Sequence, residues 1–250
     1  MVIKKITWVL FLFIALSSGC KSVQHISHTD VSYQEMKSDP AVTPDPTVTE
    51  MIEPYKVQLD SQMNEVVGNL KSDLTKQKPE STLGNWVADV MLESVRKEGY
   101  QADFSIINYG GLRVPSITAG PLTRGELFEL SPFDNMVMVV DVPGKTLDTI
   151  FQLIASSDGW PVSKGVKMVI SNKMVASSLV AGQPIDPVKI YKVATLDYVA
   201  NGGDDMKPFI RLTRVQTSKI LRDMLIDEAL KNKAAGTDIT SWIEGRIIKN

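Results

Sequence analysis

The chain has 250 residues, of which 43% are hydrophobic and 22% are charged. This composition supports a packed core, and the length allows one large domain or two small ones. The 27 lysines and arginines nearly balance the 29 aspartates and glutamates, and the resulting net charge of −2 argues against a nucleic-acid binder. Both histidines, His25 and His28, lie near the N-terminus, which removes Ser-His-Asp triads and histidine-ligated metal centres from the rest of the chain. The single cysteine, Cys20, excludes an internal disulfide.

The N-terminus has the pattern of an export signal. Lys4 and Lys5 precede an apolar stretch over residues 6–16, which is too short to span a membrane but fits the apolar core of a signal peptide. Small residues then lead into Cys20, and this pattern resembles a bacterial lipoprotein signal, in which the cysteine is lipidated. We therefore expect a signal peptide over residues 1–20 and a lipid anchor to a membrane of the bacterial cell envelope, with the protein facing the periplasm or the exterior. The alternative is an ordinary secretory signal with an incidental cysteine.

The next segment, residues 21–47, is rich in polar residues and proline and lacks apolar periodicity, which predicts a disordered tether. His25 and His28 fall in this tether without a carboxylate cluster or another cysteine nearby, so we interpret them as solvated residues rather than as a metal site. Residues 48–250 show no internal repeat and no Pro/Ser-rich break, which predicts a single domain.

Apolar periodicity predicts helices and strands in mixed order within that domain. Helices are expected over residues 48–64, 84–98 and 217–231, over a short segment that ends at residue 130, and after a turn at residues 143–144. Strands are expected near residues 66–68, 104–107, 136–142, 166–170, 189–195 and 242–248. Pro54 favours a first helix that becomes regular only there, and Thr123 with Glu126 predicts a capping box. Because the order shows no regular βαβ period, we predict an α+β fold.

Three loops next to predicted strands carry the residues of chemical interest. The first, residues 108–113, combines an amide, two glycines and an arginine; the second, residues 131–135, presents a phenylalanine behind a proline; the third, residues 197–205, ends on two aspartates. Glycines allow a close approach of backbone and ligand, and an arginine suits oxygen-rich groups. Each loop also has a purely structural interpretation, namely a tight turn, a core phenylalanine, and an acidic surface turn. Calcium binding by the third loop is disfavoured because the EF-hand ligand spacing is absent.

Four segments taken in order, residues 80–85, 108–113, 127–135 and 198–204, resemble the C-terminal domain of the 5′-nucleotidase family. The resemblance covers roughly residues 48–250. It implies a four-layer α/β/β/α sandwich, formed by a single domain behind the signal peptide and the flexible tether. It also implies a site that holds the base of a nucleotide or nucleoside between two aromatic rings.

The resemblance assigns roles to individual residues. Phe133 matches the first stacking ring, and Tyr198 stands where the family usually has a second phenylalanine. Asn108 matches a residue that contacts the base, Asp204 a carboxylate that accepts from the ribose hydroxyls, and Arg113 an arginine on the ribose and phosphate side. The complete substrate-binding set is Asn108, Gly110, Gly111, Arg113, Phe133, Asn135, Tyr198, Asn201, Gly202, Gly203 and Asp204. Residues 76–80 contain lysines but no arginine, where the family often has a further arginine.

A full-length member of this family also carries a metallophosphoesterase domain, in which two metal ions activate water. Here the tether occupies that place and the predicted domain has no histidine. We therefore expect neither catalytic residues nor a cofactor or metal in this chain, with divalent metals only in a catalytic partner. The leading hypothesis is the substrate-binding half of a split nucleotide phosphohydrolase, acting in nucleotide catabolism with a separately encoded metallophosphoesterase chain. The alternative is a non-catalytic envelope lipoprotein that binds nucleosides or nucleotides, and a purely structural role ranks third.

Overall fold

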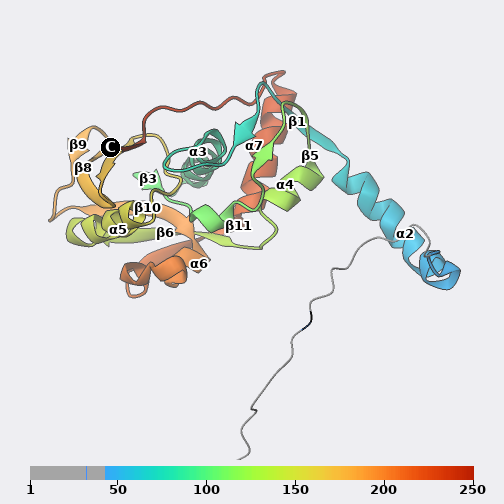
Figure 1. Ribbon diagram of the computed structural model, residues 1–250, viewed down its shortest axis with the longest axis horizontal. Helices are drawn as coiled ribbons and strands as arrows, with labels where there is room; N and C mark the ends of the chain where they lie inside the picture. The colour runs from blue at the N-terminus through green and yellow to red at the C-terminus, as the bar shows by residue number, and fades with distance from the viewer. Residues whose placement is uncertain (1–31, 33–42) are drawn as a thin grey trace, which may run out of the picture. The chain divides into compact units, whose positions relative to one another are not determined.

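Four of the strands form one sheet with the order β11-β6-β10-β3 (Figure 1). It belongs to a computed structural model, which describes residue 32 and residues 43–250. The strands of this main sheet are β3 (Phe104–Ser105), β6 (Met136–Pro143), β10 (Ile190–Leu196) and β11 (Arg214–Ile220). Strand β6 pairs antiparallel with both β10 and β11, whereas β3 runs parallel to β10. The sheet is therefore mixed, and residues 49–250 form one compact unit around it.

A second four-stranded sheet has the order β12-β7-β8-β9, and two short pairs of strands complete the β-structure of the described residues. The second sheet consists of β7 (Val166–Ser171), β8 (Met174–Val180), β9 (Gln183–Pro184) and β12 (Ile247–Lys249). The short pairs are β1 (Val66–Leu70) with β5 (Gly120–Thr123), and β2 (Leu74–Thr75) with β4 (Ser116–Ile117). The β7–β8 hairpin turns through Asn172 and Lys173, both with positive φ, as a tight hairpin turn requires.

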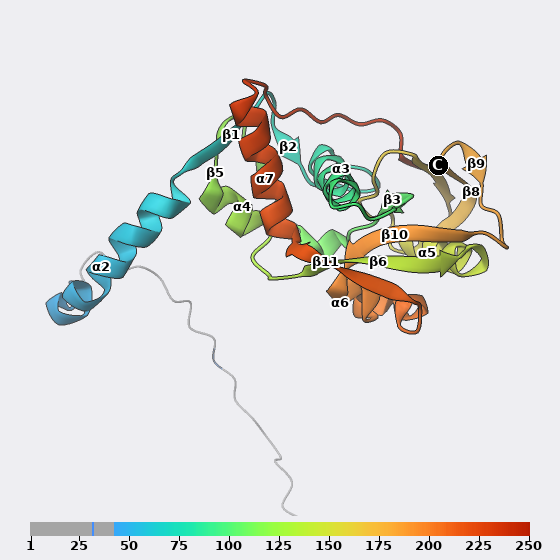
Figure 2. The same ribbon diagram turned by 180° about the vertical axis from the view of Figure 1, so that it is seen from behind.

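The helices of the described residues lie against these sheets, except the first, which has no buried residue (Figures 1 and 2). They are α2 (Pro46–Met63), α3 (Thr82–Lys97), α4 (Arg124–Leu130), α5 (Gly144–Ser156), α6 (Asp197–Ala200) and α7 (Leu221–Ala234), with short 3-10 turns at Tyr109–Gly111, Gly203–Asp205 and Lys207–Phe209. Helix α3 packs against β3, β10 and α7, whereas α5 contacts β6, β10 and β8. The prediction of an α+β sandwich is confirmed.

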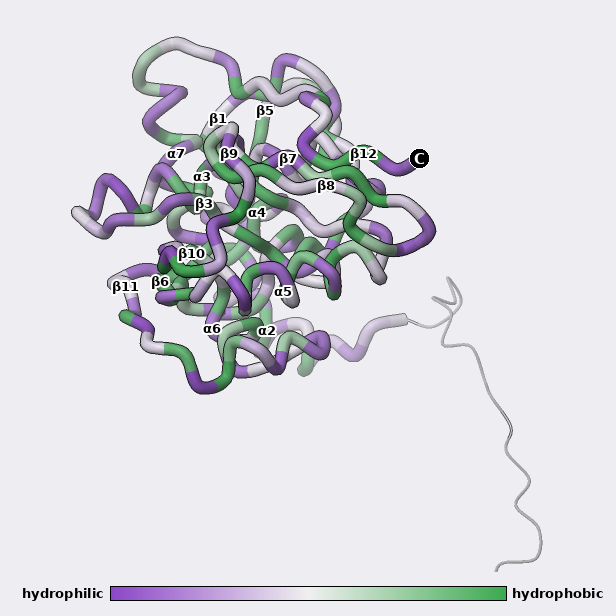
Figure 3. Tube along the Cα trace, turned by 90° about the vertical axis from the view of Figure 1, so that its left-hand side faces the viewer, coloured by the Kyte–Doolittle hydropathy of each residue, from purple (hydrophilic) through white to green (hydrophobic). Residues whose placement is uncertain are grey.

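The core is built from the apolar faces that helical spacing predicted. On α3 the face of Trp86, Val87, Val90, Met91 and Val95 is buried, and on α5 the same holds for Leu147, Ile150, Phe151 and Ile154. Phe104 of β3 meets Phe151 of α5 edge to face, with 6.0 Å between ring centroids, a favoured arrangement of two aromatic rings. Figure 3 shows the apolar stretches running through the interior and the polar residues gathering in the outer turns.

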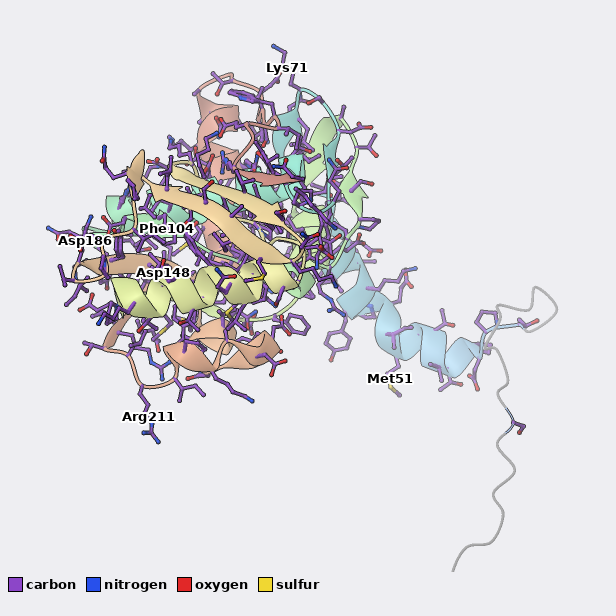
Figure 4. The ribbon with its side chains drawn as sticks, turned by 60° about the vertical axis from the view of Figure 1, so that its left-hand side comes forward. Met51, Lys71, Phe104, Asp148, Asp186 and Arg211 are labelled. Atoms are coloured by element: carbon purple, nitrogen blue, oxygen red, sulfur yellow. The ribbon has the colours of Figure 1, made fainter. Side chains whose placement is uncertain are left out.

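The first helix differs from its prediction. Helix α2 begins at Pro46, so Pro54 lies inside it rather than in its first turn, and the last two residues of the predicted tether are helical. The Asp45 carboxylate accepts a hydrogen bond of 2.8 Å from the Thr47 amide, as an N-capping residue does, which explains the earlier start. No residue of α2 is buried, and Met51 projects from it into solvent (Figure 4). No helix in the described part of the chain is long and apolar enough to cross a bilayer.

Three further predictions are wrong in their details. The helix expected over 217–231 begins at Leu221, because residues 214–220 form strand β11 beside β6. The strand expected over 242–248 is confined to Ile247–Lys249, since that is where the chain pairs with β7. The turn expected at residues 143–144 is a direct junction, where β6 ends and α5 begins. By contrast, the capping box of Thr123 and Glu126 at the start of α4 is confirmed. The predicted signal peptide lies outside the described residues, as does the tether apart from residue 32 and residues 43–47.

Candidate nucleotide-binding site

The register of the main sheet brings the three loops to the same end of its strands. Leu196 at the end of β10 lies opposite Val137, which is near the start of β6, so the loop after β10 adjoins the loop before β6. Ser105 of β3 pairs with Ala194 of β10, and the parallel direction carries the segment after β3 towards the same edge. The loops 108–113, 131–135 and 197–205 therefore leave neighbouring strands at the same end of the sheet.

Asp204 forms the polar centre of this loop cluster. Its Oδ2 accepts a hydrogen bond of 2.7 Å from Nδ2 of Asn108, across 96 positions of sequence. Its Oδ1 accepts a hydrogen bond of 3.0 Å from the hydroxyl of Tyr198. This hydrogen bond and the nearby carboxylate charge raise the pKa of Tyr198 above its ordinary value, because both favour the neutral phenol. Two of the predicted contacts to a nucleoside thus converge on one carboxylate.

The backbone of the third loop is unusually bent. Gly202 has φ +90°, a conformation that favours glycine, and Asp204 and Asp205 follow with φ values of 51° and 62°. Such a conformation costs a residue other than glycine on the order of 1 kcal/mol, and the two hydrogen bonds to Asp204 help to offset this cost. At Gly203 a Cβ atom would lie within 2.4 Å of the Tyr198 ring, so the ring rests directly on the turn. The glycines here allow the aromatic ring and the carboxylate to share one small loop.

Asn108, the first residue of the first loop, is buried. A Cβ atom on Gly111 would stand 2.6 Å from Oδ1 of Asn108, and one on Gly110 would lie 3.9 Å from Oδ2 of Asp204. Neither glycine needs a positive φ. What they supply is space beside Asn108, whose Oδ1 is buried and has no hydrogen-bond partner within the described residues. An unpaired buried acceptor costs roughly 1–3 kcal/mol.

Phe133 projects from the second loop and is 49% exposed. The guanidinium carbon of Arg113 lies 5.5 Å from the centroid of the Phe133 ring, which joins the first two loops through a cation–π contact. Tyr198 is 46% exposed, so both predicted stacking rings present surface to solvent. The interpretation of Phe133 as a core residue is therefore wrong, because β6 begins only at Met136 and leaves the ring outside the sheet packing.

Two lysines of the segment 76–80, where the family often has a further arginine, lie against the ring of Tyr109. Nζ of Lys76 lies 4.2 Å from the ring centroid and Nζ of Lys78 lies 4.8 Å from it. Lys76 donates to the Leu112 carbonyl at 2.7 Å, and Lys78 donates to the Ser157 carbonyl. Partial burial and the positive charges of Arg113 and Lys78 lower the pKa of Lys76. We call Lys76, Lys78 and Arg113 the cation cluster.

The remaining predicted residues are placed differently. Asn135 accepts a hydrogen bond from the Leu221 amide through its main-chain carbonyl, and Asn201 closes the turn of α6 through its amide. Neither side chain makes a hydrogen bond to the other predicted site residues. Cys20, the predicted lipidation site, lies outside the described residues. No group of three or more His, Cys, Asp or Glu side chains within residue 32 and residues 43–250 is arranged to hold a metal ion.

The segment 80–85, which carried part of the family resemblance, has a structural role. Oε1 of Glu80 accepts from Nδ2 of Asn85 at 2.7 Å and from the Glu244 amide at 2.8 Å, while Oε2 accepts from the Arg246 amide at 2.7 Å. Glu80 and Asn85 are buried. They attach the C-terminal segment to the start of α3.

The family model of the 5′-nucleotidase C-terminal domain matches residues 65–211, which include all three loops. Because this match covers more than half of the chain, the chain belongs to the 5′-nucleotidase family through its C-terminal domain. Every residue of the loop cluster lies inside the matched range, whereas α7 and the C-terminal strand lie beyond it.

Individual relatives give the same result. The chain is 28% identical over 219 residues to "Silent protein UshA(0)" of Salmonella typhimurium, covering 82% of this chain and 39% of that relative. It is 30% identical over 171 residues to protein UshA of Yersinia enterocolitica, covering 65% of this chain and 30% of that relative. A crystal structure of a 5′-nucleotidase precursor from Thermus thermophilus is similar with a TM-score of 0.69 and 25% identity, over 81% of this chain and 43% of that one. The chain thus spans less than half the length of each of these proteins.

Proposed function

We propose that the loop cluster binds a nucleotide or nucleoside. The observation that carries this proposal is the Asp204 carboxylate, which Asn108 holds by a hydrogen bond of 2.7 Å at the sheet edge from which Phe133 and Tyr198 also project. A carboxylate accepts hydrogen bonds from a sugar diol, and an exposed aromatic ring stacks on a base with little dependence on its identity.

The cation cluster supports a phosphorylated ligand. No carboxylate of the described residues lies within ion-pair distance of Lys76, Lys78 or Arg113, although all three lie beside the first loop. Uncompensated positive charge attracts anions, and an arginine adds a planar pair of donors for phosphate oxygens. The ammonium groups of the two lysines act as point charges. In this proposal the chain binds the base and ribose with its loops and the phosphate with the cluster.

The proposed role of the chain is to bind and orient the substrate of a split nucleotide phosphohydrolase in nucleotide catabolism. A separately encoded metallophosphoesterase chain would carry the metal ions and the hydrolytic step, and a lipid anchor at Cys20 would hold this half to a membrane of the cell envelope. Membership of the 5′-nucleotidase family supports this proposal. No step of the hydrolysis is assigned to residues of this chain.

Calorimetric titration of adenosine and AMP into the full chain, kept in mild detergent, tests the binding proposal. We expect both ligands to bind, and AMP to bind more tightly because of the cation cluster. Equal affinities would remove the phosphate role of the cluster but keep nucleoside recognition. The absence of heat with both ligands at millimolar concentration would overturn the proposal.

The split-enzyme proposal needs a second experiment. An exported metallophosphoesterase that lacks this domain is mixed with the chain, and phosphate release from AMP is measured with several divalent metals. The expected result is metal-dependent release that neither protein shows alone. If the mixture stays inactive while the chain still binds adenosine, the split-enzyme proposal fails and the non-catalytic binding protein takes its place.

A further inference from the structure

Tyr198 and Asn108 approach Asp204 from environments that differ in solvent access. Asn108 is only 5% exposed and donates to Oδ2, whereas Tyr198 is 46% exposed and donates to Oδ1. The buried amide therefore holds the inner side of the carboxylate. The phenol occupies a position on the side that solvent reaches, which is the side from which a ligand must arrive.

The ring of Tyr198 also covers the turn that carries Asp204. Its carbons Cε1, Cζ and Cδ1 all lie within 2.7 Å of the position that a Cβ atom on Gly203 would take. Such contact requires the ring to rest on the backbone of the turn. One face of the ring is thus used by the protein itself, and the hydroxyl at its end meets Asp204.

We propose that the hydroxyl of Tyr198 is a competitor of the ligand for Oδ1 of Asp204. A ligand that carries a sugar diol displaces the hydroxyl from this oxygen and donates to it instead. This inference rests on the proposed function and names a specificity-determining residue within that site. The displaced hydroxyl is half exposed and forms a hydrogen bond with water instead. A ligand without a diol gains nothing from the displacement and leaves the tyrosine in place.

The proposal predicts that removing the hydroxyl oxygen of Tyr198 changes the affinity for ligands that carry a diol. In the variant Tyr198→Phe the stacking ring remains, but Asp204 is free to accept from the diol. Because Tyr198 is partly exposed, we assign its hydrogen bond the net value of an ordinary one, which corresponds to about a five- to tenfold change in affinity. The gain appears only for ligands that carry the diol, because only those ligands break the Tyr198–Asp204 bond.

The test compares adenosine with 2′,3′-dideoxyadenosine by calorimetric titration into the full chain and into Tyr198→Phe. We expect adenosine to bind the variant about five- to tenfold more tightly than the unchanged chain, and dideoxyadenosine to bind both proteins equally. Tyr100→Phe is the matched control: its hydroxyl meets only the Gln216 carbonyl, at 3.5 Å, and its loss should leave both affinities unchanged.

The outcomes separate the two proposals. If adenosine binds the unchanged chain and Tyr198→Phe with equal affinity, or binds the variant more weakly, the competitor role is overturned while nucleoside recognition stands. A gain that is the same for adenosine and dideoxyadenosine also overturns it, because the diol is then irrelevant. If neither ligand binds either protein, nucleoside recognition fails and the competitor role fails with it. Thermal unfolding, monitored by circular dichroism, verifies that the variant folds.

Discussion

Arg222 of α7 holds the loop that presents Phe133 through an ion pair with Asp134. Nη2 of Arg222 lies 2.5 Å from Oδ1 of Asp134, and Nη1 donates to the Ser131 carbonyl at 3.1 Å. The guanidinium carbon also lies 4.1 Å from the centroid of the Phe128 ring. The side chain of Arg222 is 9% exposed and that of Asp134 is 78% exposed, so the arginine anchors the loop from beneath. The position of Phe133, the proposed stacking ring, thus depends on a helix that begins 88 residues after it.

Arg222→Met should destabilise the protein and weaken ligand binding together. Methionine retains the apolar stem of the side chain but has no guanidinium, so the buried Ser131 carbonyl loses its donor, at a cost of about 1–3 kcal/mol. Urea unfolding measures the loss of stability, and calorimetry with adenosine measures the weaker binding that a loosened Phe133 loop should produce. Lys164→Met is the control: its ion pair with Glu93 is 56% and 40% exposed and should contribute at most about 0.5 kcal/mol. Equal stabilities of the two variants would refute the anchoring role.

Phe133→Ala should weaken adenosine binding while leaving the free energy of unfolding almost unchanged. The ring is 49% exposed, so its removal should change the free energy of unfolding by no more than about 0.5 kcal/mol. Loss of base stacking should weaken adenosine binding by roughly 1–3 kcal/mol, or about five- to 150-fold. Titration and urea unfolding of the variant test both statements. Val215→Ala, which removes an equally exposed apolar side chain from β11, should leave the affinity unchanged. A large loss of stability with unchanged affinity would show instead that Phe133 is a packing residue.

Glu80→Gln should loosen the C-terminal segment without affecting the site. Glutamine keeps the shape of the side chain, but its NH₂ group must face either the Arg246 amide or the donors of Glu244 and Asn85. Leaving one buried donor unpaired costs about 1–3 kcal/mol. Hydrogen exchange should become faster over residues 244–249, while adenosine affinity stays constant. Glu50→Gln on the exposed helix α2 serves as the control. A weaker affinity in Glu80→Gln would contradict the separation of the two regions.

The cation cluster predicts a pH dependence for phosphate recognition. Lys76 has a lowered pKa, so it loses its charge at a lower pH than an ordinary lysine as the solution becomes alkaline. The preference for AMP over adenosine should therefore decrease as the pH rises towards the ordinary lysine range. A bound phosphate stabilises the charged lysine and raises its pKa, so AMP binding at alkaline pH should take up protons. Titrations in buffers of different ionisation enthalpy measure this uptake.

Lys76→Met provides the matching variant. It should reduce the preference for AMP and remove the alkaline pH dependence, while adenosine affinity stays within about twofold because no base or ribose contact changes. Lys71→Met, which removes an exposed lysine outside the cation cluster, is the control (Figure 4). An unchanged AMP preference in Lys76→Met would contradict the assignment of the cluster to phosphate.

Local patterns predicted the elements whose contacts are made between near neighbours in sequence. The capping box of Thr123 and Glu126 spans three positions, and the apolar faces of α3 and α5 repeat every three or four positions. The errors occur where partners are distant. Residues 217–220 read as the first turn of a helix, yet Gln216 and Ile220 lie opposite Met138 and Met136 in the sheet. The second strand of the β7–β8 hairpin is absent from the prediction because residues 174–180 show no alternation of polar and apolar side chains, and most of them are exposed or half-buried.

The amino-acid sequence by itself determined the chemical groups of the candidate site and their order along the chain. It could not show that Asn108 and Tyr198 would meet on Asp204, or that Lys76, Lys78 and Arg222 would lie behind the loops. It also grouped Glu80 and Asn85 with the loops, although they hold the C-terminal segment. Only the tertiary structure decided these relationships. The reason is that strand register in the β11-β6-β10-β3 sheet, a collective property of contacts up to about 90 positions apart, fixes which loops share an edge.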